Sequence, residues 1–153
     1  MKKMNPEYVS EIARITNACN FFQLISMRIE NLSWGKSELT ISAGEKHLQP
    51  YGIVHGGICA SIVDASCFWA VFTQLDEDNG LTTVDVRLNY LAPVVSGTLF
   101  GKGECIRLGK TIGLGQAGIY NEKGDMVAYG TSTVMTLPGF ELKEGMPDAP
   151  KYL

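Results

Sequence analysis

The stretch Gln49-Pro-Tyr-Gly-Ile-Val-His-Gly-Gly-Ile-Cys-Ala-Ser-Ile-Val-Asp-Ala-Ser-Cys-Phe-Trp-Ala-Val-Phe72 runs from a glycine-rich turn into an apolar segment that carries one carboxylate, Asp64. Apolar residues recur at helical spacing over 56–75, and Asp64 is the only charged residue there. The pattern therefore predicts a buried helix. A membrane span is the competing interpretation, but a central Asp and several hydroxyl and amide side chains make insertion costly.

Length and composition limit the classes of protein to which the chain can belong. Its 153 residues, 45% of them hydrophobic, suffice for one domain with a core. A net charge of −3 provides no basic face, so we expect no nucleic-acid partner and no membrane partner. The four cysteines form no CxxC pair, and the N-terminus has no apolar signal segment, so we expect a reduced, cytoplasmic protein.

The remaining segments predict an α+β fold. A short helix is expected from Pro6 to about Asn17, and a C-terminal tail, loosely held, over 138–153. Alternation and turn residues predict strands over 23–31, 36–42, 81–91, 98–108, 111–120 and 126–137. The order is helix, hairpin, long helix and four-stranded meander. It indicates an antiparallel sheet that wraps around the long helix, in a single domain of residues 1–137.

Asp64 requires compensation, because an ionised carboxylate in an apolar helix destabilises the fold unless it is paired, hydrogen-bonded or hydrated. Its helical neighbours toward the N-terminus, Gly57, Ala60 and Ser61, are small and leave room for a ligand or a second chain. The alternative is a structural Asp that caps a neighbouring loop or pairs with an arginine. Both interpretations stay open at this point.

The glycines before the helix favour a functional role. Gly56 and Gly57 at a helix start expose amide N–H groups at the positive end of the helix dipole. Such groups bind an oxygen that develops negative charge, and the amide of Gln49 can donate to the same oxygen. An oxyanion pocket and a carboxylate that serves as base or nucleophile are the two parts that acyl transfer needs.

The spacing of these groups predicts an oligomer. Gly56 and Asp64 are eight residues apart, which is about 12 Å along a helix. They cannot both touch one carbonyl. A two-fold partner with an antiparallel helix alongside would bring Asp64 of one subunit to Gly56 of the other, so a functional pair implies at least a dimer.

These residues resemble the hotdog-fold acyl-CoA thioesterases, in particular the phenylacetate-pathway-like branch of the 4-hydroxybenzoyl-CoA thioesterase superfamily. The resemblance covers about residues 49–135. It is carried by Gly52-x-x-His-Gly-Gly57 with Asp64 nine residues after His55, by Val84-Asp-x-x-x-Asn-Tyr-x-x-Pro93, by Leu108-Gly-Lys110, and by Gly130-Thr-x-Thr133. The motifs are specific in this order and spacing.

The resemblance implies roles for several residues. The Gly56 N–H, helped by Gln49, would polarise the thioester carbonyl, and Asp64 of the facing subunit would activate water or attack directly. Thr83 would help to place the water. The alternation of Val84, Val86, Leu88 and Tyr90 instead puts Thr82 on the helix side, unless a bulge reverses the order.

The same resemblance implies a CoA site that includes Gly57 and Tyr90 together with the turn formed by Arg107, Leu108, Gly109, Lys110 and Thr111. Arg107 and Lys110 suit phosphates, although two solvated charges at a hairpin tip are an equal alternative. His55 would mainly shape the turn and orient Gln49 or the substrate. We expect a homodimer that forms the site, assembled as a homotetramer, with no cofactor beyond the CoA of the substrate and no metal.

Two other functions compete with a thioesterase. A hydratase or dehydratase of hydroxyacyl thioesters shares the fold but pairs a catalytic His with a carboxylate, and His55 and Asp64 lack that spacing. A non-catalytic acyl-CoA-binding module is the second alternative. The acyl group is open, since Phe68, Trp69, Phe72 and Tyr51 would line an aromatic pocket, whereas aromatic residues on a buried helix more often belong to the core.

Overall fold

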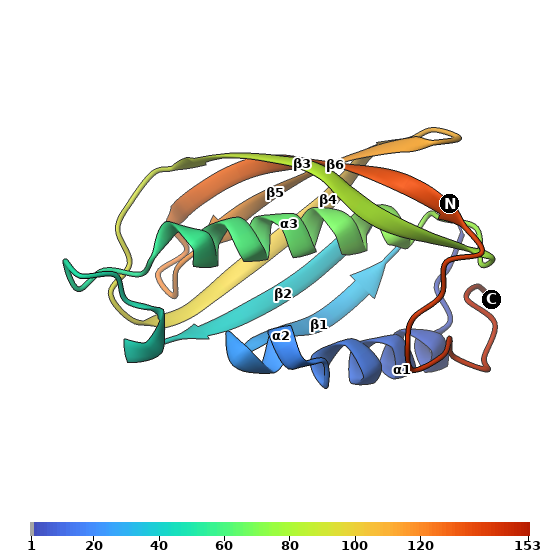
Figure 1. Cartoon of the computed structure of the whole chain (residues 1–153), viewed down its shortest axis with the longest axis horizontal. Helices are drawn as coiled ribbons and strands as arrows, with labels where there is room; N and C mark the ends of the chain where they lie inside the picture. The colour runs from blue at the N-terminus through green and yellow to red at the C-terminus, as the bar shows by residue number, and fades with distance from the viewer. Residues whose placement is uncertain (1) are drawn as a thin grey trace.

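A six-stranded antiparallel sheet curves around one long helix in the computed structural model, which describes residues 2–153 (Figure 1). The elements in chain order are α1 (Pro6–Asn17), α2 (Asn20–Leu24), β1 (Met27–Ser33), β2 (Lys36–Ala43), a 3-10 turn (Glu45–His47), α3 (Gly56–Phe72), β3 (Asn79–Tyr90), β4 (Gly97–Leu108), β5 (Ile112–Tyr120) and β6 (Met126–Pro138). The predicted α+β fold, with an antiparallel sheet wrapped around a long central helix, is confirmed. The prediction missed α2, so the first strand begins four residues later than expected.

The strand order is β1-β2-β4-β5-β6-β3. The predicted meander of four consecutive strands is therefore wrong, because β3 does not pair with β4. The segment between them crosses the sheet, so that β4 pairs with β2 while β3 pairs with β6 at the opposite edge. The hairpins β4–β5 and β5–β6 form as their short connections require.

The core lies between the concave face of the sheet and α3, whose buried residues include Ile62, Val63 and Trp69. Glycines on β4 and β5 bring the sheet close to the helix. A Cβ on Gly115 would lie 2.8 Å from the Cβ of Cys67, nearer than side chains normally approach. Small residues on these strands thus fix the position of α3 and of the groups that it carries.

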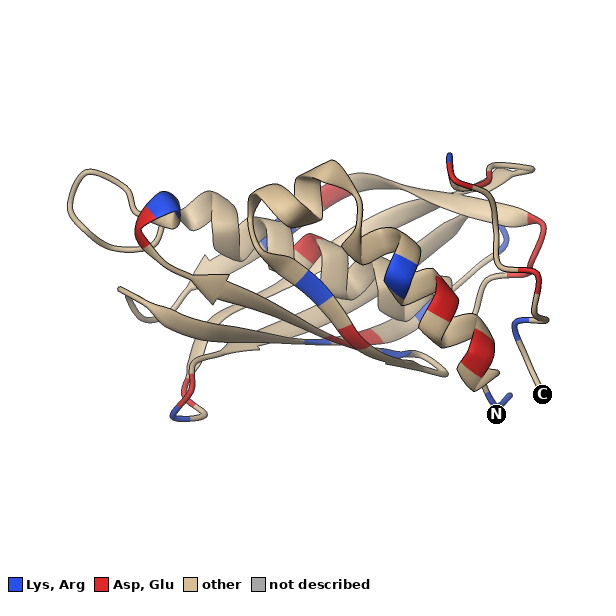
Figure 2. Ribbon diagram, turned by 90° about the horizontal axis from the view of Figure 1, so that it is seen from below, with Lys and Arg blue, Asp and Glu red and all other residues tan. Residues whose placement is uncertain are grey.

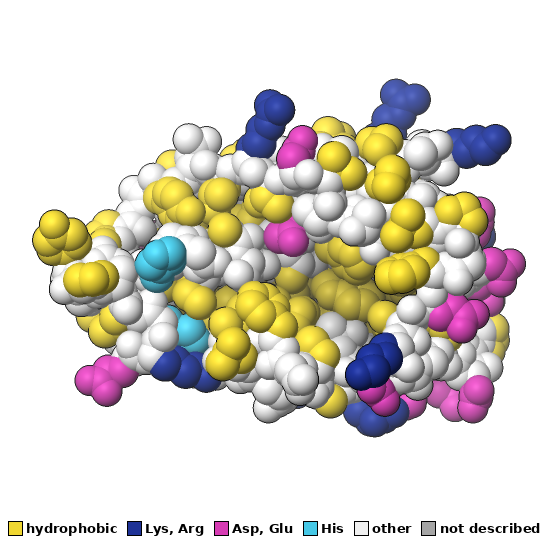
Figure 3. Space-filling view, in the orientation of Figure 1, with side chains coloured by type: hydrophobic (Ala, Val, Ile, Leu, Met, Phe, Trp, Pro, Cys, Tyr) yellow, Lys and Arg dark blue, Asp and Glu magenta, His cyan; other side chains and the backbone are white. Residues whose placement is uncertain are grey.

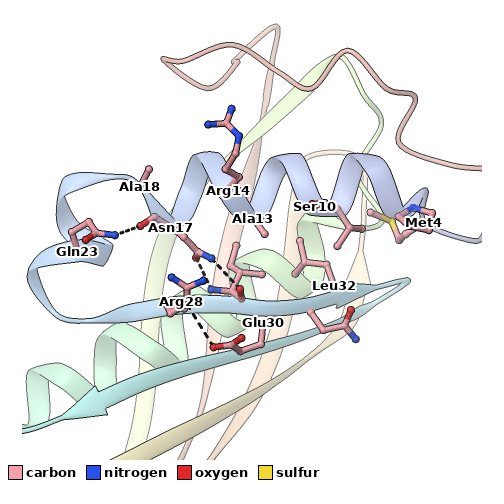
Figure 4. Close-up of a pocket in the computed structure, with 14 residues that line it drawn as sticks. Met4, Ser10, Ala13, Arg14, Asn17, Ala18, Gln23, Arg28, Glu30 and Leu32 are labelled. Carbon is pink, nitrogen blue, oxygen red and sulfur yellow. Dashed lines mark hydrogen bonds and ion pairs between the residues drawn. The ribbon is translucent and has the colours of Figure 1, made fainter.

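One edge of the sheet, β1, is covered by α1. The side-chain amide of Asn17 donates to the carbonyl of Ile29 at 3.1 Å and accepts from the N–H of Ile29 at 2.7 Å, as a neighbouring strand would (Figure 4). Several charged residues belong to α1, among them Glu11 and Arg14, whereas Asp64 is the one charged residue of α3, as the coloured ribbon segments of Figure 2 indicate. At the other edge, β3 has no strand partner on its outer side among residues 2–153.

The prediction of a loosely held tail is wrong for its last residues. Lys151 is 1% exposed, and its Nζ donates to the carbonyls of Phe72 at 2.7 Å and Leu75 at 2.6 Å. The hydroxyl of Tyr152 donates toward the carbonyl of Thr73 at 2.9 Å. The tail supplies donors to carbonyls at and just after the end of α3, which no periodic pattern in the sequence reveals.

Candidate active site

Asp64 lies in the middle of α3 and is held by two hydroxyl groups from the sheet. The hydroxyl of Thr83 on β3 donates to Asp64 Oδ1 at 2.9 Å. The hydroxyl of Ser132 on β6 lies 2.9 Å from the same oxygen and 3.1 Å from the carbonyl of Asp85. Within residues 2–153 the structure gives Oδ2 no donor, and this second oxygen is therefore available for chemistry.

A β-bulge places Thr83, rather than Thr82, beside Asp64. The pairing of β3 with β6 shifts register between Thr83 and Asp85, so Val84 has no partner and is 56% exposed. Thr83 and Val86 consequently both face the helix, although they are three positions apart in sequence. The expectation from plain alternation, which placed Thr82 on the helix side, is wrong because of this bulge.

A cavity of about 860 Å³ opens beside Asp64 between α3 and the N-terminal helices. Thr83 and Ser61 contribute polar groups near the carboxylate, and most of the remaining lining is apolar. In Figure 3 a hollow floored by hydrophobic side chains is visible on this face, between the upper edge of the sheet and the helices below it. Asp64 is therefore a partly buried carboxylate on the wall of an apolar cavity.

A separate cavity of about 370 Å³ lies at the start of α3 and is lined by Gln49, Gly56 and Tyr90 among others. No acceptor within residues 2–153 receives the Gly56 N–H, which stands at the first position of the helix. The N–H of Tyr51 donates to Gln49 Oε1, so the Nε2 amine of Gln49 is left as a donor. Two N–H donors thus line this cavity, as an oxyanion pocket requires.

His55 caps α3 in the structure. Its Nδ1 accepts a hydrogen bond from the Gly57 N–H at 2.8 Å, which leaves the Gly57 amide unavailable to a ligand. The other histidine, His47, is buried and bonded at both ring nitrogens, to the Gly44 N–H and to the carbonyl of Ile25. Both histidines thus make structural hydrogen bonds, and among residues 2–153 neither of them is hydrogen-bonded to Asp64.

Gly56 and Asp64 line different cavities of one chain. Both belong to α3, and the eight residues between them correspond to about 12 Å of helix. The oxyanion donors and the carboxylate of a single chain therefore do not meet on one carbonyl. The chain thus carries these two sets of groups, called half-sites below, in separate cavities.

The buried cysteines near these half-sites are poor nucleophiles. Burial raises the pKa of the Cys67 thiol to about 12, and the nearby charge of Asp64 acts in the same direction. Burial also raises the pKa of Cys59, which lines the cavity of Gly56. Since the thiolate is the reactive form, Asp64 has no competitor among them.

The residues predicted to bind CoA do not gather in one chain. Tyr90 pairs with Ala128 near the beginning of β6, and its hydroxyl donates to the carbonyl of Gly56 at 3.1 Å. The turn that contains Arg107, Leu108, Gly109, Lys110 and Thr111 is close to the end of β6, where the carbonyl of Thr111 accepts from Thr136 at 2.8 Å. Tyr90 and this turn therefore lie toward opposite ends of β6 in one chain.

Within residues 2–153, a second groove and the arrangement of metal-binding residue types add no other candidate site. A groove of about 770 Å³ between α1 and β1 is lined by Arg14, Arg28 and Glu30 among others, with Arg14 directed away from β1 (Figure 4). Among residues 2–153, no three His, Cys, Asp or Glu side chains lie close enough together to hold a metal ion. No helix in that range is long and apolar enough to cross a membrane.

Comparison with known proteins identifies the family. The sequence model of the thioesterase superfamily matches residues 51–128, more than half of the chain. The chain belongs to the thioesterase superfamily. A crystal structure of a thioesterase from Haemophilus influenzae superposes on this thioesterase with a TM-score of 0.82 at 20% identity, over 94% of this chain and 99% of that chain. The fold is thus the hotdog fold of these enzymes, as the sequence resemblance implied.

Two other proteins extend the comparison. A thioesterase family protein from Silicibacter pomeroyi superposes on this thioesterase with a TM-score of 0.77 at 27% identity, over 85% of this chain and 98% of that chain. The 1,4-dihydroxy-2-naphthoyl-CoA hydrolase of Listeria monocytogenes is 21% identical over 112 residues, which cover 73% of this chain and 91% of that protein.

Ser132 is the site residue that sequence reasoning missed. It occupies the unspecified position of the motif Gly130-Thr-x-Thr133. Together with Ala128, Gly130 and Val134, it follows a two-residue alternation of buried positions. A hydroxyl on the buried face of a strand needs a hydrogen-bond partner, and this requirement was the one sequence signal that pointed to Ser132.

Proposed function

We propose that the protein hydrolyses an acyl-CoA thioester to the free acid and CoA. The observation that carries the proposal is the division of the machinery along α3. Asp64, with Oδ1 bound to two hydroxyls, lines one cavity, while the free Gly56 amide and Gln49 line another. The named CoA-thioester hydrolase of Listeria monocytogenes supports CoA as the carrier.

In the proposed reaction, the thioester carbonyl oxygen accepts from the Gly56 N–H and from Gln49 Nε2. Asp64 Oδ2 takes a proton from water, whose oxygen attacks the carbonyl carbon. The tetrahedral oxyanion stays bound to the two donors until the C–S bond breaks, and the departing CoA sulfur takes the proton that Asp64 had accepted from water. In the other route Asp64 attacks the carbonyl carbon itself, the C–S bond breaks with loss of the CoA thiolate, and water hydrolyses the resulting anhydride to the free acid and the Asp64 carboxylate.

The proposed assembly is a homodimer in which each site takes Gly56 from one subunit and Asp64 from the other, with two dimers forming a homotetramer. The free edge of β3 supports it. This strand is 12 residues long, and Val84, Tyr90 and Leu91 expose apolar surface along and beside it. An uncovered edge strand is a template for pairing with a second copy, and a two-fold axis makes the two α3 helices antiparallel.

Mixed dimers test the shared site. Asp64→Asn and Gly56→Pro should each lower kcat/KM at least about a hundredfold, since one removes the base and the other an oxyanion donor. When equal amounts are combined by refolding together, half of the dimers are mixed and one of their two sites is intact. About a quarter of the wild-type activity should therefore return.

Gly56→Ala is the matched control for Gly56→Pro. Both variants place a Cβ about 2.8 Å from the hydroxyl of Tyr90, but alanine keeps the N–H. Alanine should therefore retain most of the activity that proline loses. A mixture no more active than its parents contradicts the shared site, and a wild-type protein that hydrolyses no CoA thioester contradicts the enzyme assignment.

The contacts of His55 favour a thioesterase over a hydratase of the same fold. A hydratase requires a histidine paired with a carboxylate, whereas His55 Nδ1 caps α3. The retained, hydrogen-bonded Asp64 likewise favours catalysis over an acyl-CoA-binding module without activity. For location we propose the cytoplasm, in keeping with four cysteines that are free, two of them buried.

A further inference from the structure

The cavity beside Asp64 has an aromatic wall. Phe68 and Trp69 from α3 line it with their rings in edge contact at a centroid distance of 5.4 Å, and Phe21 and Phe22 from α2 line it as well. Phe21 is 51% exposed, although large apolar residues normally pack away from water. The wall is thus built to receive apolar surface.

Much of this wall comes from segments outside the part of the chain that matches the family. The match covers residues 51–128, whereas α2 precedes it and Leu142 follows it. Apart from Asp64, the charged residues of the lining are Arg14, Lys143 and Glu144, and all three come from outside the matched range. The matched core therefore supplies the carboxylate, and the ends of the chain complete the chamber around it.

We infer that this cavity is the acyl-binding chamber and that it selects thioesters of bulky apolar acyl groups, such as benzoyl or octanoyl, over acetyl. The inference rests on the proposed function. A volume of about 860 Å³ lies in the range of sites that enclose drug-sized ligands. Aromatic rings accept a second ring edge-on or an alkyl chain against their faces, and an acetyl group leaves that surface uncovered.

Phe21→Ala tests the chamber, with Leu24→Ala as its control. Both side chains are exposed on α2, but Leu24 does not line the cavity. Hydrolysis of acetyl-CoA, octanoyl-CoA and benzoyl-CoA is measured for the wild type and both variants. Phe21→Ala should lower kcat/KM for octanoyl-CoA or benzoyl-CoA about tenfold and leave acetyl-CoA unchanged. Leu24→Ala should change none of the three.

The outcomes separate this inference from the proposed function. The acyl-chamber inference is wrong if the wild type has a higher kcat/KM for acetyl-CoA than for the bulky thioesters. It is also wrong if Phe21→Ala keeps the wild-type ratio of kcat/KM between bulky and acetyl thioesters. Either result leaves the thioesterase proposal unaffected. Absence of turnover with all three thioesters overturns both. The comparison of octanoyl-CoA with benzoyl-CoA shows which kind of bulky acyl group the chamber prefers.

A second inference concerns Ser132, which no motif assigned. Its side chain is fully buried, and its single hydroxyl proton faces two acceptors, Asp64 Oδ1 and the carbonyl of Asp85. A hydrogen bond to an ionised carboxylate is stronger than one to a neutral carbonyl, so the proton favours Asp64 while that group is charged. Asp85 O lies at the bulge that also positions Thr83.

We propose that Ser132 is a positioning residue, which holds Asp64 Oδ1 so that Oδ2 faces the reacting water. Ser132→Ala should lower kcat about tenfold with KM within about twofold, because misplacing a reacting group affects the transition state more than binding. Loss of a donor to the charged carboxylate should also move the acid limb of the kcat/KM profile to higher pH.

Ser66→Ala is the matched control. Ser66 is another fully buried serine, two residues after Asp64 on α3, and its hydroxyl has no partner within residues 2–153. Its removal should leave kcat and the pH profile unchanged. If Ser132→Ala remains folded by circular dichroism yet keeps the wild-type kcat and acid limb, or if both variants lose activity equally, the positioning role is overturned.

Discussion

At the scale of single residues, the bulge in β3 makes a prediction that separates two adjacent threonines. Thr83→Val removes a donor to Asp64 Oδ1 but keeps the shape of the side chain. It should lower kcat about tenfold, because the carboxylate loses one of two contacts that orient it. Thr82→Val, on the neighbouring residue, should stay within about twofold of the wild type, and steady-state kinetics compare the two.

The reverse result would have a clear meaning. If Thr82→Val lowered kcat and Thr83→Val did not, Thr82 would be the threonine that faces Asp64. The strand would then follow the simple alternation through Val84, without a bulge beside the candidate active site. Sequence alone could not decide this, since a bulge depends on how β3 pairs with β6 and leaves no mark in either strand. For the same reason Ser132 escaped notice, because its partner is distant in sequence.

At the scale of elements, the parts with a strong local signal were predictable. The apolar period and the glycines before it indicated α3, and its predicted end differs from the observed Phe72 by three residues. Alternation and short turns likewise revealed the strands. Helix α2 was missed because its five residues are too few for a periodic signal, yet it supplies Phe21 and Phe22 to the cavity beside Asp64.

The strand order was less predictable, because the link from β3 to β4 is compatible with a neighbouring strand or with a crossing. The crossing has a functional consequence. It leaves β3, which carries Thr83, at a free edge, while the hairpin partners β5 and β6 stay inside the sheet. Thr83, which donates to Asp64, therefore lies on the strand best placed to meet a second copy.

At the scale of the whole molecule, the two ends of the chain are joined to each other and to α3. The N–H of Asn5 donates to the carbonyl of Lys151 at 2.9 Å, and Met4 forms a β-bridge with Tyr152. The Lys151 ammonium lies 4.2 Å from the centroid of the Phe72 ring. Leu142 of the same tail lines the cavity beside Asp64. The contacts that hold the tail against α3 therefore also help to position one wall of that cavity.

Lys151 makes the stability of this arrangement depend on pH. Burial lowers its pKa from 10.5 to about 8. Below about pH 8 both the folded and the unfolded chain hold the proton, so the cost of burying the charge is fully present. Between about pH 8 and 10.5 the folded chain releases the proton first, and the free energy of unfolding rises with pH by up to about 3 kcal/mol from this group.

Urea unfolding of the wild type and of Lys151→Met, at one protomer concentration and at several pH values from 7 to 10, measures this contribution. The free energy of unfolding of the wild type relative to the variant should increase above pH 8. The informative quantity is the free energy of unfolding of the wild type minus that of the variant. Burial raises the pKa of Tyr8 and Tyr152, so in both proteins these tyrosines lower the free energy of unfolding at higher pH, and the subtraction removes their effect. Parallel curves for the two proteins would mean that Lys151 keeps its proton in the folded state, stabilised by the carbonyls of Phe72 and Leu75.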